Sequence, residues 1–83
     1  MITPSATPRA LTQRQQEVLL GVGRGDSIKE IASALNISDR TVELHLFRIR
    51  SKLHARSTAH ALAIAFTFQL LDLHERRLLP NKT

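Results

Sequence analysis

The stretch Glu30–Leu53, EIASALNISDRTVELHLFRIRSKL, holds two helical patterns that are separated by only three residues. Ser27 and the first glutamate of this stretch form a capping box, which predicts a helix over residues 28–35. Asn36 belongs to the few non-glycine residue types that adopt the left-handed conformation ending a helix, and Ser38 is a good N-cap for a new one. The interruption therefore predicts a tight turn between two helices.

The second helix of this pair is expected to run over residues 39–53 and to present two different faces. Since an α-helix turns by about 100° per residue, its core side is a narrow apolar stripe made of Val42, Leu46, Ile49 and Leu53. The opposite face mixes basic, acidic and apolar side chains, namely Arg40, Glu43, Leu44, Phe47, Arg48 and Ser51. A helix that only needed to be soluble would not place Leu44 and Phe47 there, so we expect this face to bind a partner.

Two further helices flank this pair. The first follows a capping box of Thr12 and Gln15, and its apolar side and its glycine-rich end consist of Leu11, Val18 and Val22, and of Gly23 and Gly25. The last follows the N-cap Ser57 and is expected to continue at least to Leu71. The predicted fold class is all-α, a four-helix domain with a central helix-turn-helix over residues 11–73, between a flexible N-terminal arm or linker, 1–10, and a C-terminal tail, 74–83.

The last helix is apolar on nearly opposite faces, and a helix that is apolar all round needs two packing partners. We expect its inner face to consist of Ala59, Leu62, Phe66 and Leu70. The outer face would then meet a second copy of the chain, the N-terminal arm or a further domain, and it consists of Ile64, Phe68 and Leu71. Because two-fold dimers are the commonest closed assemblies, we favour a homodimer through this outer face.

Basic charge is concentrated on and after the second helix of the central pair. The chain of 83 residues has a formal net charge of +5, and the segment 40–56 sets five basic residues against the single acid Glu43: Arg40, Arg48, Arg50, Lys52 and Arg56. Five positive charges minus one negative charge place +4 of the total in this segment. A concentrated basic stripe is typical of a surface that binds a polyanion.

Several functional classes lack the residues that they require. There is no cysteine, which excludes a disulfide framework and a thiolate metal site, and the four histidines form no zinc motif: His45, His54, His60 and His74. We expect His45 to be a hydrogen-bonded structural residue. No triad spacing, nucleophile elbow or glycine-rich phosphate loop points to an enzyme or to a cofactor. No secretory signal and no run long enough to span a membrane are found, which favours the cytoplasm.

A helix-turn-helix packs its two helices at a steep angle, so that the outer face of the second helix protrudes. An α-helix fits the major groove of B-DNA, where each base pair presents its own pattern of hydrogen-bond donors and acceptors. Basic side chains at the margins of such a helix neutralise phosphates, while the middle of its outer face reads bases. The sequence therefore favours specific binding to double-stranded DNA.

Three blocks of the sequence, LTQRQQEVL, KEIASALNISDRTVELHL and KLHARS, resemble in order and spacing the LuxR-type DNA-binding domain, which is also called the NarL- or FixJ-type helix-turn-helix. The resemblance covers about residues 11–66. It implies a bacterial transcription regulator whose third helix enters the major groove and whose fourth helix forms the dimer contact. Such a regulator acts at the nucleoid, with RNA polymerase as a further partner.

The resemblance also implies roles for individual residues. The expected base contacts are Glu43, Leu44, Phe47 and Arg48, and the expected phosphate contacts are Arg40, Thr41, Arg50, Lys52 and Arg56. Family members usually carry Glu, a basic residue, a small polar residue and Gly at four positions where this chain has Gln15, Glu43, Arg48 and His54. Because the reading face differs, no known operator transfers to this chain, and Gln15 cannot form an ion pair.

A second interpretation stays open. The chain would then be a protein-interaction module that keeps the helix-turn-helix shape but docks on another protein through the outer face of the third helix. Leu44 and Phe47 favour this interpretation, because they can also pack under the N-terminal arm or a partner domain. Retention on heparin or random duplex DNA at low salt separates the two hypotheses, since a protein-interaction module would be retained little.

Overall fold

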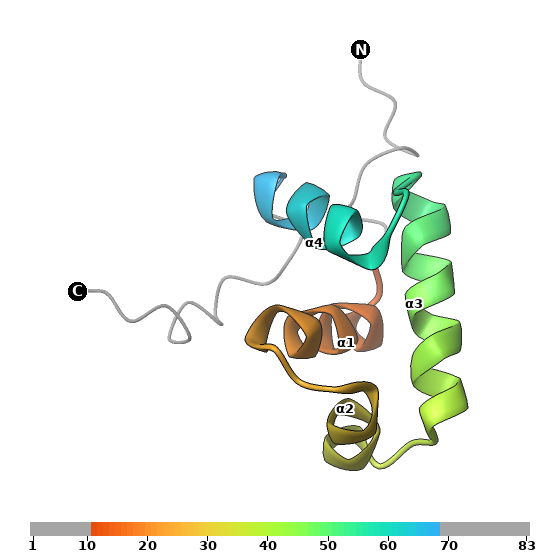
Figure 1. Cartoon of the computed structure of the whole chain (residues 1–83). Coiled ribbons are helices and arrows are strands. Elements are labelled where there is room, and N and C mark those ends of the chain that lie inside the picture. The colour runs from red at the N-terminus through yellow and green to blue at the C-terminus, as the bar shows by residue number, and fades with distance from the viewer. Residues whose placement is uncertain (1–10, 69–83) are drawn as a thin grey trace, which may run out of the picture.

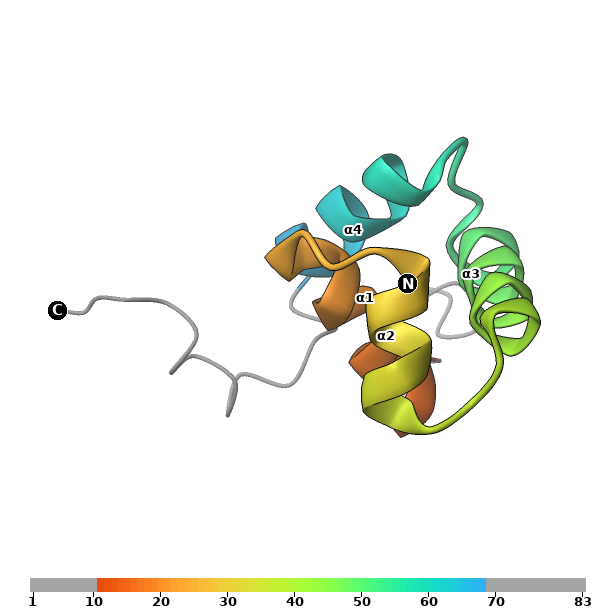
Figure 2. The same cartoon turned by 60° about the horizontal axis from the view of Figure 1, so that its bottom comes forward.

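The computed structural model describes residues 11–68, which fold into four helices without a strand. The helices are α1 (Gln13–Arg24), α2 (Ile28–Leu35), α3 (Asp39–Leu53) and α4 (Thr58–Thr67). Helix α1 lies between α2 and α4, and α3 runs past all three along one side of the molecule (Figure 1). The turned view in Figure 2 keeps α3 on that side. The predicted all-α fold with a central helix-turn-helix is confirmed, whereas the expected arm, the tail and residues 69–73 lie outside the described residues.

Each helix begins at the N-cap that the sequence predicts. The hydroxyl groups of Thr12, Ser27, Ser38 and Ser57 each accept a hydrogen bond from the backbone N–H three residues further on, at 3.0 Å. Both predicted capping boxes are complete, because the backbone N–H groups of Thr12 and Ser27 donate back to Gln15 and Glu30. Local side chains therefore set where every helix starts.

The turn between α2 and α3 has the predicted construction. Asn36 adopts the left-handed conformation with φ of 58°, and the N–H of Ile37 donates to the carbonyl of Ala32 at 2.9 Å. The side chain of Ile37 packs back against the core. The same left-handed conformation ends α1 at Gly25 and α3 at His54. Gly23, which was expected to help to end the first helix, instead lies inside α1.

The core forms where α3 packs against the other three helices. The predicted stripe on α3 is confirmed, since all four of its residues are buried: Val42, Leu46, Ile49 and Leu53. Val18 and Leu19 of α1 are fully buried as well. Gly21, which the sequence did not single out, brings α1 close to α2, because a Cβ atom at this position would lie 2.7 Å from Cγ1 of Ile31.

The inner face of α4 differs from the predicted one. Ala61 and Ala65 are fully buried, while Ala59 and Phe66 are exposed, so the expectation that these two face inward is wrong. Small alanine side chains let α4 approach the core closely, and a Phe at the same position would not fit. The half-buried Leu62 and Ile64 flank the alanines, while Leu70 lies outside the described residues. The helix ends at Thr67, before the expected Leu71.

Candidate nucleic-acid interface

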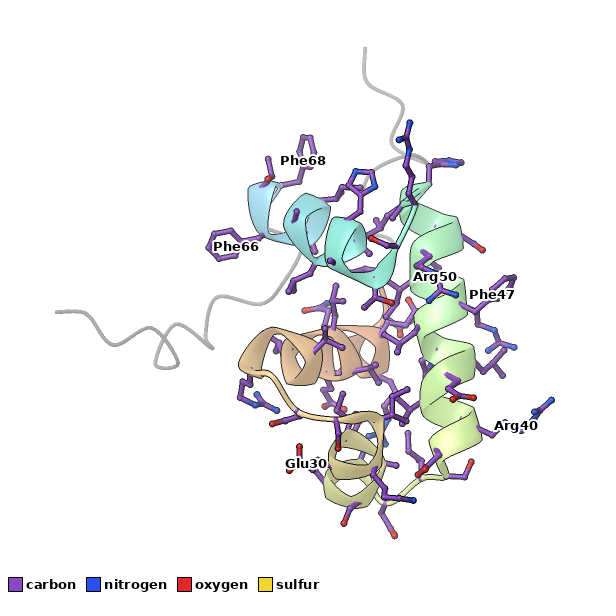
Figure 3. The ribbon with its side chains drawn as sticks, viewed as in Figure 1. Glu30, Arg40, Phe47, Arg50, Phe66 and Phe68 are labelled. Carbon is purple, nitrogen blue, oxygen red and sulfur yellow. The ribbon has the colours of Figure 1, made fainter. Side chains whose placement is uncertain are left out.

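The outer face of α3 carries basic, acidic and apolar side chains and points away from the core. All six predicted members are exposed: Arg40, Glu43, Leu44, Phe47, Arg48 and Ser51. Figure 3 shows Arg40 and Phe47 projecting from α3 on the side opposite the other helices. Leu44 is 43% exposed and Phe47 is 58% exposed, so neither side chain packs under the described part of the chain.

The positive charge on this face is not neutralised within residues 11–68. The ion pairs found there join Arg14 to Glu17, Arg24 to Asp26 and Lys29 to Asp39, and the last of them links α2 to the first residue of α3. No such bond involves Arg40, Arg48 or Arg56 among these residues. Unpaired guanidinium groups around one protruding helix attract a polyanion, because their fields add in front of that helix.

A polar contact that the sequence analysis missed supports one flank of α3. The ammonium group of Lys52 donates to Oε1 of Gln15 at 3.0 Å, and the N–H of Thr12 donates to the same oxygen at 3.0 Å. Gln15 is only 5% exposed. One buried amide oxygen therefore holds the start of α1 and the end of α3 together, and a residue 37 positions away supplies the second donor. No local pattern reveals a pair so far apart in the sequence.

The opposite flank of α3 is tied to α4. Nη1 of Arg50 donates to Oγ1 of Thr58 at 3.2 Å, and Figure 3 shows Arg50 on the part of α3 nearest to α4. Arg56 lies in the short connection that follows α3, and its backbone N–H donates to Nδ1 of His60 at 3.0 Å. The expected phosphate contacts thus divide into exposed side chains, Arg40 and Arg56, and half-buried ones along the edges of the face, Thr41, Arg50 and Lys52.

A shallow depression lies at the C-terminal end of the outer face. Its volume is about 390 Å³, it opens widely to solvent, and its lining residues are Phe47, Arg50, Ser51, His54 and Ala55. An open surface of this kind does not enclose a small substrate, which ligand sites usually do. It does extend the outer face of α3 to Ala55, in the short connection that follows the helix.

His45 behaves differently from its expected role as a hydrogen-bonded residue. Its Nδ1 atom is shielded from solvent and has no hydrogen-bond partner within residues 11–68, so that expectation is wrong. Burial lowers the pKa of this imidazole, and the positive charges of Arg48 and Arg14 lower the pKa further. The ring therefore stays neutral at pH 7 and lies between the core stripe and the basic face.

Comparison with known proteins agrees with this geometry. The sequence model for bacterial regulatory proteins of the luxR family matches residues 9–65, which include all four helices except the last two residues of α4. The chain belongs to the luxR family. The resemblance that the three sequence blocks indicate is confirmed, and the chain carries the helix-turn-helix domain of DNA-binding transcription regulators rather than of a family of enzymes.

Relatives of this LuxR-type domain include proteins named response regulator protein VraR in Staphylococcus aureus, Staphylococcus saprophyticus and Staphylococcus epidermidis. Each is 41% identical over 62 residues, which cover 75% of this chain but only 30% of the relative. The chain therefore spans less than a third of the length of these relatives. Within residues 11–68 no helix is long and apolar enough to cross a membrane, and no cluster of metal-binding side chains is found.

Proposed function

We propose that this LuxR-type domain binds specific sequences of double-stranded DNA by inserting the outer face of α3 into the major groove. The observation that carries the proposal is the combination of exposure and unpaired charge on that face. Arg40 and Arg48 have no acidic partner among the described residues, and Leu44 and Phe47 lie between them in an exposed position. Phosphates and base edges provide partners for the arginine side chains, and thymine methyl groups provide partners for the apolar side chains.

The proposal assigns one set of residues to the bases and another set to the phosphates. The base contacts are Glu43, Leu44, Phe47 and Arg48, which are exposed on the outer face. The phosphate contacts are Arg40, Thr41, Arg50, Lys52 and Arg56, which lie at the ends and edges of that face. The internal hydrogen bonds of Arg50 and Lys52 support this assignment, because a side chain that is already oriented loses less entropy when it meets a phosphate.

The proposed assembly is a homodimer through α4 that binds two half-sites. Phe68 is 63% exposed, while Ile64 is half-buried against the core, so Phe68 is the main described contact of the proposed interface. Leu71, its third expected member, lies outside the described residues. The likeness to proteins named response regulators supports a role as the DNA-binding part of such a regulator. We further propose that it acts with RNA polymerase at the nucleoid in the cytoplasm.

A second candidate function is docking on another protein through the same face of α3. The exposure of Leu44 and Phe47 favours it, because apolar side chains at these fractions also suit a protein partner. The unpaired arginines around them favour DNA. The two candidates differ in salt dependence, since each phosphate contact contributes about 0.9 to the slope of log affinity against log salt.

The test is selection of bound duplexes from a random library, followed by salt titration on the selected site. We expect Arg56→Ala to reduce the slope by about 0.9 on selected and random duplexes alike. Arg24→Ala is the matched control, because it removes the same charge from the end of α1 that lies far from α3 in Figure 1. Binding without any salt dependence, or retention of no duplex at all, contradicts the proposal.

A further inference from the structure

The outer face of α3 combines an acid with apolar neighbours, which is an unusual set for a helix that approaches DNA. Glu43 is exposed and forms no ion pair or hydrogen bond among the described residues, while Leu44 and Phe47 beside it are exposed as well. A lone carboxylate repels phosphates and weakens general attraction to DNA. It therefore needs a specific donor in the groove to be tolerated when DNA is bound.

We propose that Glu43 and Phe47 together read a cytosine amino group that lies beside a C5 methyl group in the major groove. This inference rests on the proposed function of the α3 face. It names the chemistry of the base edge that the face selects, which DNA binding by itself leaves open.

Helix geometry brings the two side chains together. Residues four apart on a helix have Cβ atoms about 5–6 Å from each other, so Phe47 is the neighbour of Glu43 one turn further along α3. Both side chains are exposed on the outer face of α3, so neither is covered by the rest of the described chain. Figure 3 shows the ring of Phe47 projecting away from the core. An acceptor and an apolar surface are thus presented side by side to one base step.

The chemistry of the base edges selects the partner. An ionised carboxylate only accepts hydrogen bonds, and cytosine presents the N4 amino donor in the major groove. Guanine presents two acceptors and thymine presents O4, so each would face the Glu43 carboxylate with like charge density. Adenine has an amino group but also an N7 acceptor and no methyl group. Phe47 gains only when a C5 methyl group covers its ring.

Two sources supply a methyl group next to a cytosine amino group. In 5-methylcytosine both groups stand on adjacent atoms of one ring. In an unmodified duplex the methyl group comes from a thymine at the neighbouring step. The contacts required of Glu43 and Phe47 are the same in both cases, so duplexes that place the methyl group on one base or on the other separate the two sources.

The experiment uses a single half-site duplex selected by the 83-residue chain from a random library, which excludes effects of dimerisation. The duplex is then remade in two ways, with 5-methylcytosine in place of each cytosine, or with deoxyuridine in place of each thymine. We expect affinity to rise about fourfold with 5-methylcytosine at one position, or to fall about fourfold with deoxyuridine next to a cytosine, as burial of one apolar carbon implies. Either result supports the inference and identifies the source.

Variants attribute the effect to the two side chains. Phe47→Ala should remove the methyl effect, Phe47→Leu should restore part of it, and Glu43→Gln should relax the preference for cytosine. Glu17→Gln on α1 is the matched control for charge, and it should leave the preference unchanged. If wild type binds its selected duplex but responds to neither base change, or if Phe47→Ala keeps the response, the inference is wrong while DNA binding stands. If no duplex is selected, the proposed function and this inference both fail.

Discussion

Two surfaces of this domain expose aromatic side chains to a similar extent, yet their surroundings differ. On α3, Phe47 is 58% exposed and lies among the charged groups of the outer face. Phe66 on α4 and Phe68, the C-cap residue directly after it, are 66% and 63% exposed, and α4 itself, TAHALAIAFT, holds no acidic residue, lysine or arginine. Figure 3 shows Phe47 on one side of the molecule and the α4 pair on the far side. Exposure alone therefore does not separate these surfaces, whereas their charge does.

The difference indicates two kinds of partner. An apolar side chain among unpaired arginines suits a polyanion that also carries methyl groups, which describes the DNA major groove. An apolar pair on a helix without charged residues suits another apolar protein surface, because no lysine or arginine of α4 attracts phosphate there. The contacts that hold the two helices in place differ as well. Hydrogen bonds from Lys52 and Arg50 hold α3 on both flanks, while buried alanines anchor the inner side of α4.

The largest expected effect comes from a substitution at the exposed end of α4, and it tests whether this surface contacts a second copy of the chain. Phe68→Glu should lower the apparent affinity for a duplex with two half-sites by about a hundredfold or more, because the advantage of linking two bound copies is lost. Binding to a single half-site and the helical circular dichroism spectrum should not change. Phe47→Glu is the comparison variant, and it should weaken binding to both duplexes. If Phe68→Glu still binds two half-sites cooperatively, the dimer contact lies elsewhere.

The next prediction concerns which side of α4 packs inward. Ala65→Leu should lower the free energy of unfolding by about 1–3 kcal/mol, since a buried site has no room for a larger side chain. Phe66→Ala should change it by less than about 0.5 kcal/mol, because that side chain is exposed. Thermal unfolding followed by circular dichroism measures both changes. If Phe66→Ala destabilised the domain more than Ala65→Leu, the inner face expected from the sequence, which includes Phe66, would be correct.

A smaller effect on stability is expected at the hydrogen bond between Lys52 and Gln15, which joins α3 to α1. Gln15→Glu should raise the free energy of unfolding by about 1 kcal/mol at low salt, because Lys52 and the N–H of Thr12 would then donate to a charged acceptor. The gain should shrink as salt increases. In a Lys52→Met background the same change should destabilise the domain, since it buries an unpaired carboxylate. Equal effects in the two backgrounds would show that Lys52 is not the partner.

The smallest expected effect comes from His45, on the inner flank of α3. Burial and the charges of Arg48 and Arg14 lower the pKa of His45 below its usual value of 6.5. Below pH 6.5 the unfolded chain therefore binds more protons at this residue than the folded domain does, so acidification favours unfolding. Urea unfolding at pH 7.5 and at pH 5.5 should show a loss of stability that is smaller in His45→Phe. An unchanged pH dependence in this variant would contradict the assignment.

Most of the fold follows from local sequence signals. The N-caps and capping boxes depend on residues three positions apart, and Asn36 determines its turn by itself, so these features are readable without a structure. The buried stripe on α3 can be predicted because the polar residues on the opposite side show which side of that helix faces solvent. The exposed members of the proposed reading face follow from the same wheel.

Other features depend on information that no local pattern holds. Helix α4 is apolar on all sides, so a helical wheel does not predict which side faces the core. Only the close approach of the helices shows that Ala61 and Ala65 face inward. The bond between Lys52 and Gln15 joins positions 37 apart, and His45 lacks a partner because of what surrounds it in space. Long-range packing decides each of these three features.

The local caps also bear on how fast the domain folds. Each N-cap bond closes only three residues of chain, and the bonds that end α1, α2 and α3 from Asp26, Ile37 and Ala55 each close five. Short closures cost little chain entropy before they form, and helical domains rich in such contacts fold within microseconds to milliseconds. The long closure between Gln15 and Lys52 can then form last, on helices that already exist. We therefore expect a transiently unfolded copy to regain the outer face of α3 within milliseconds.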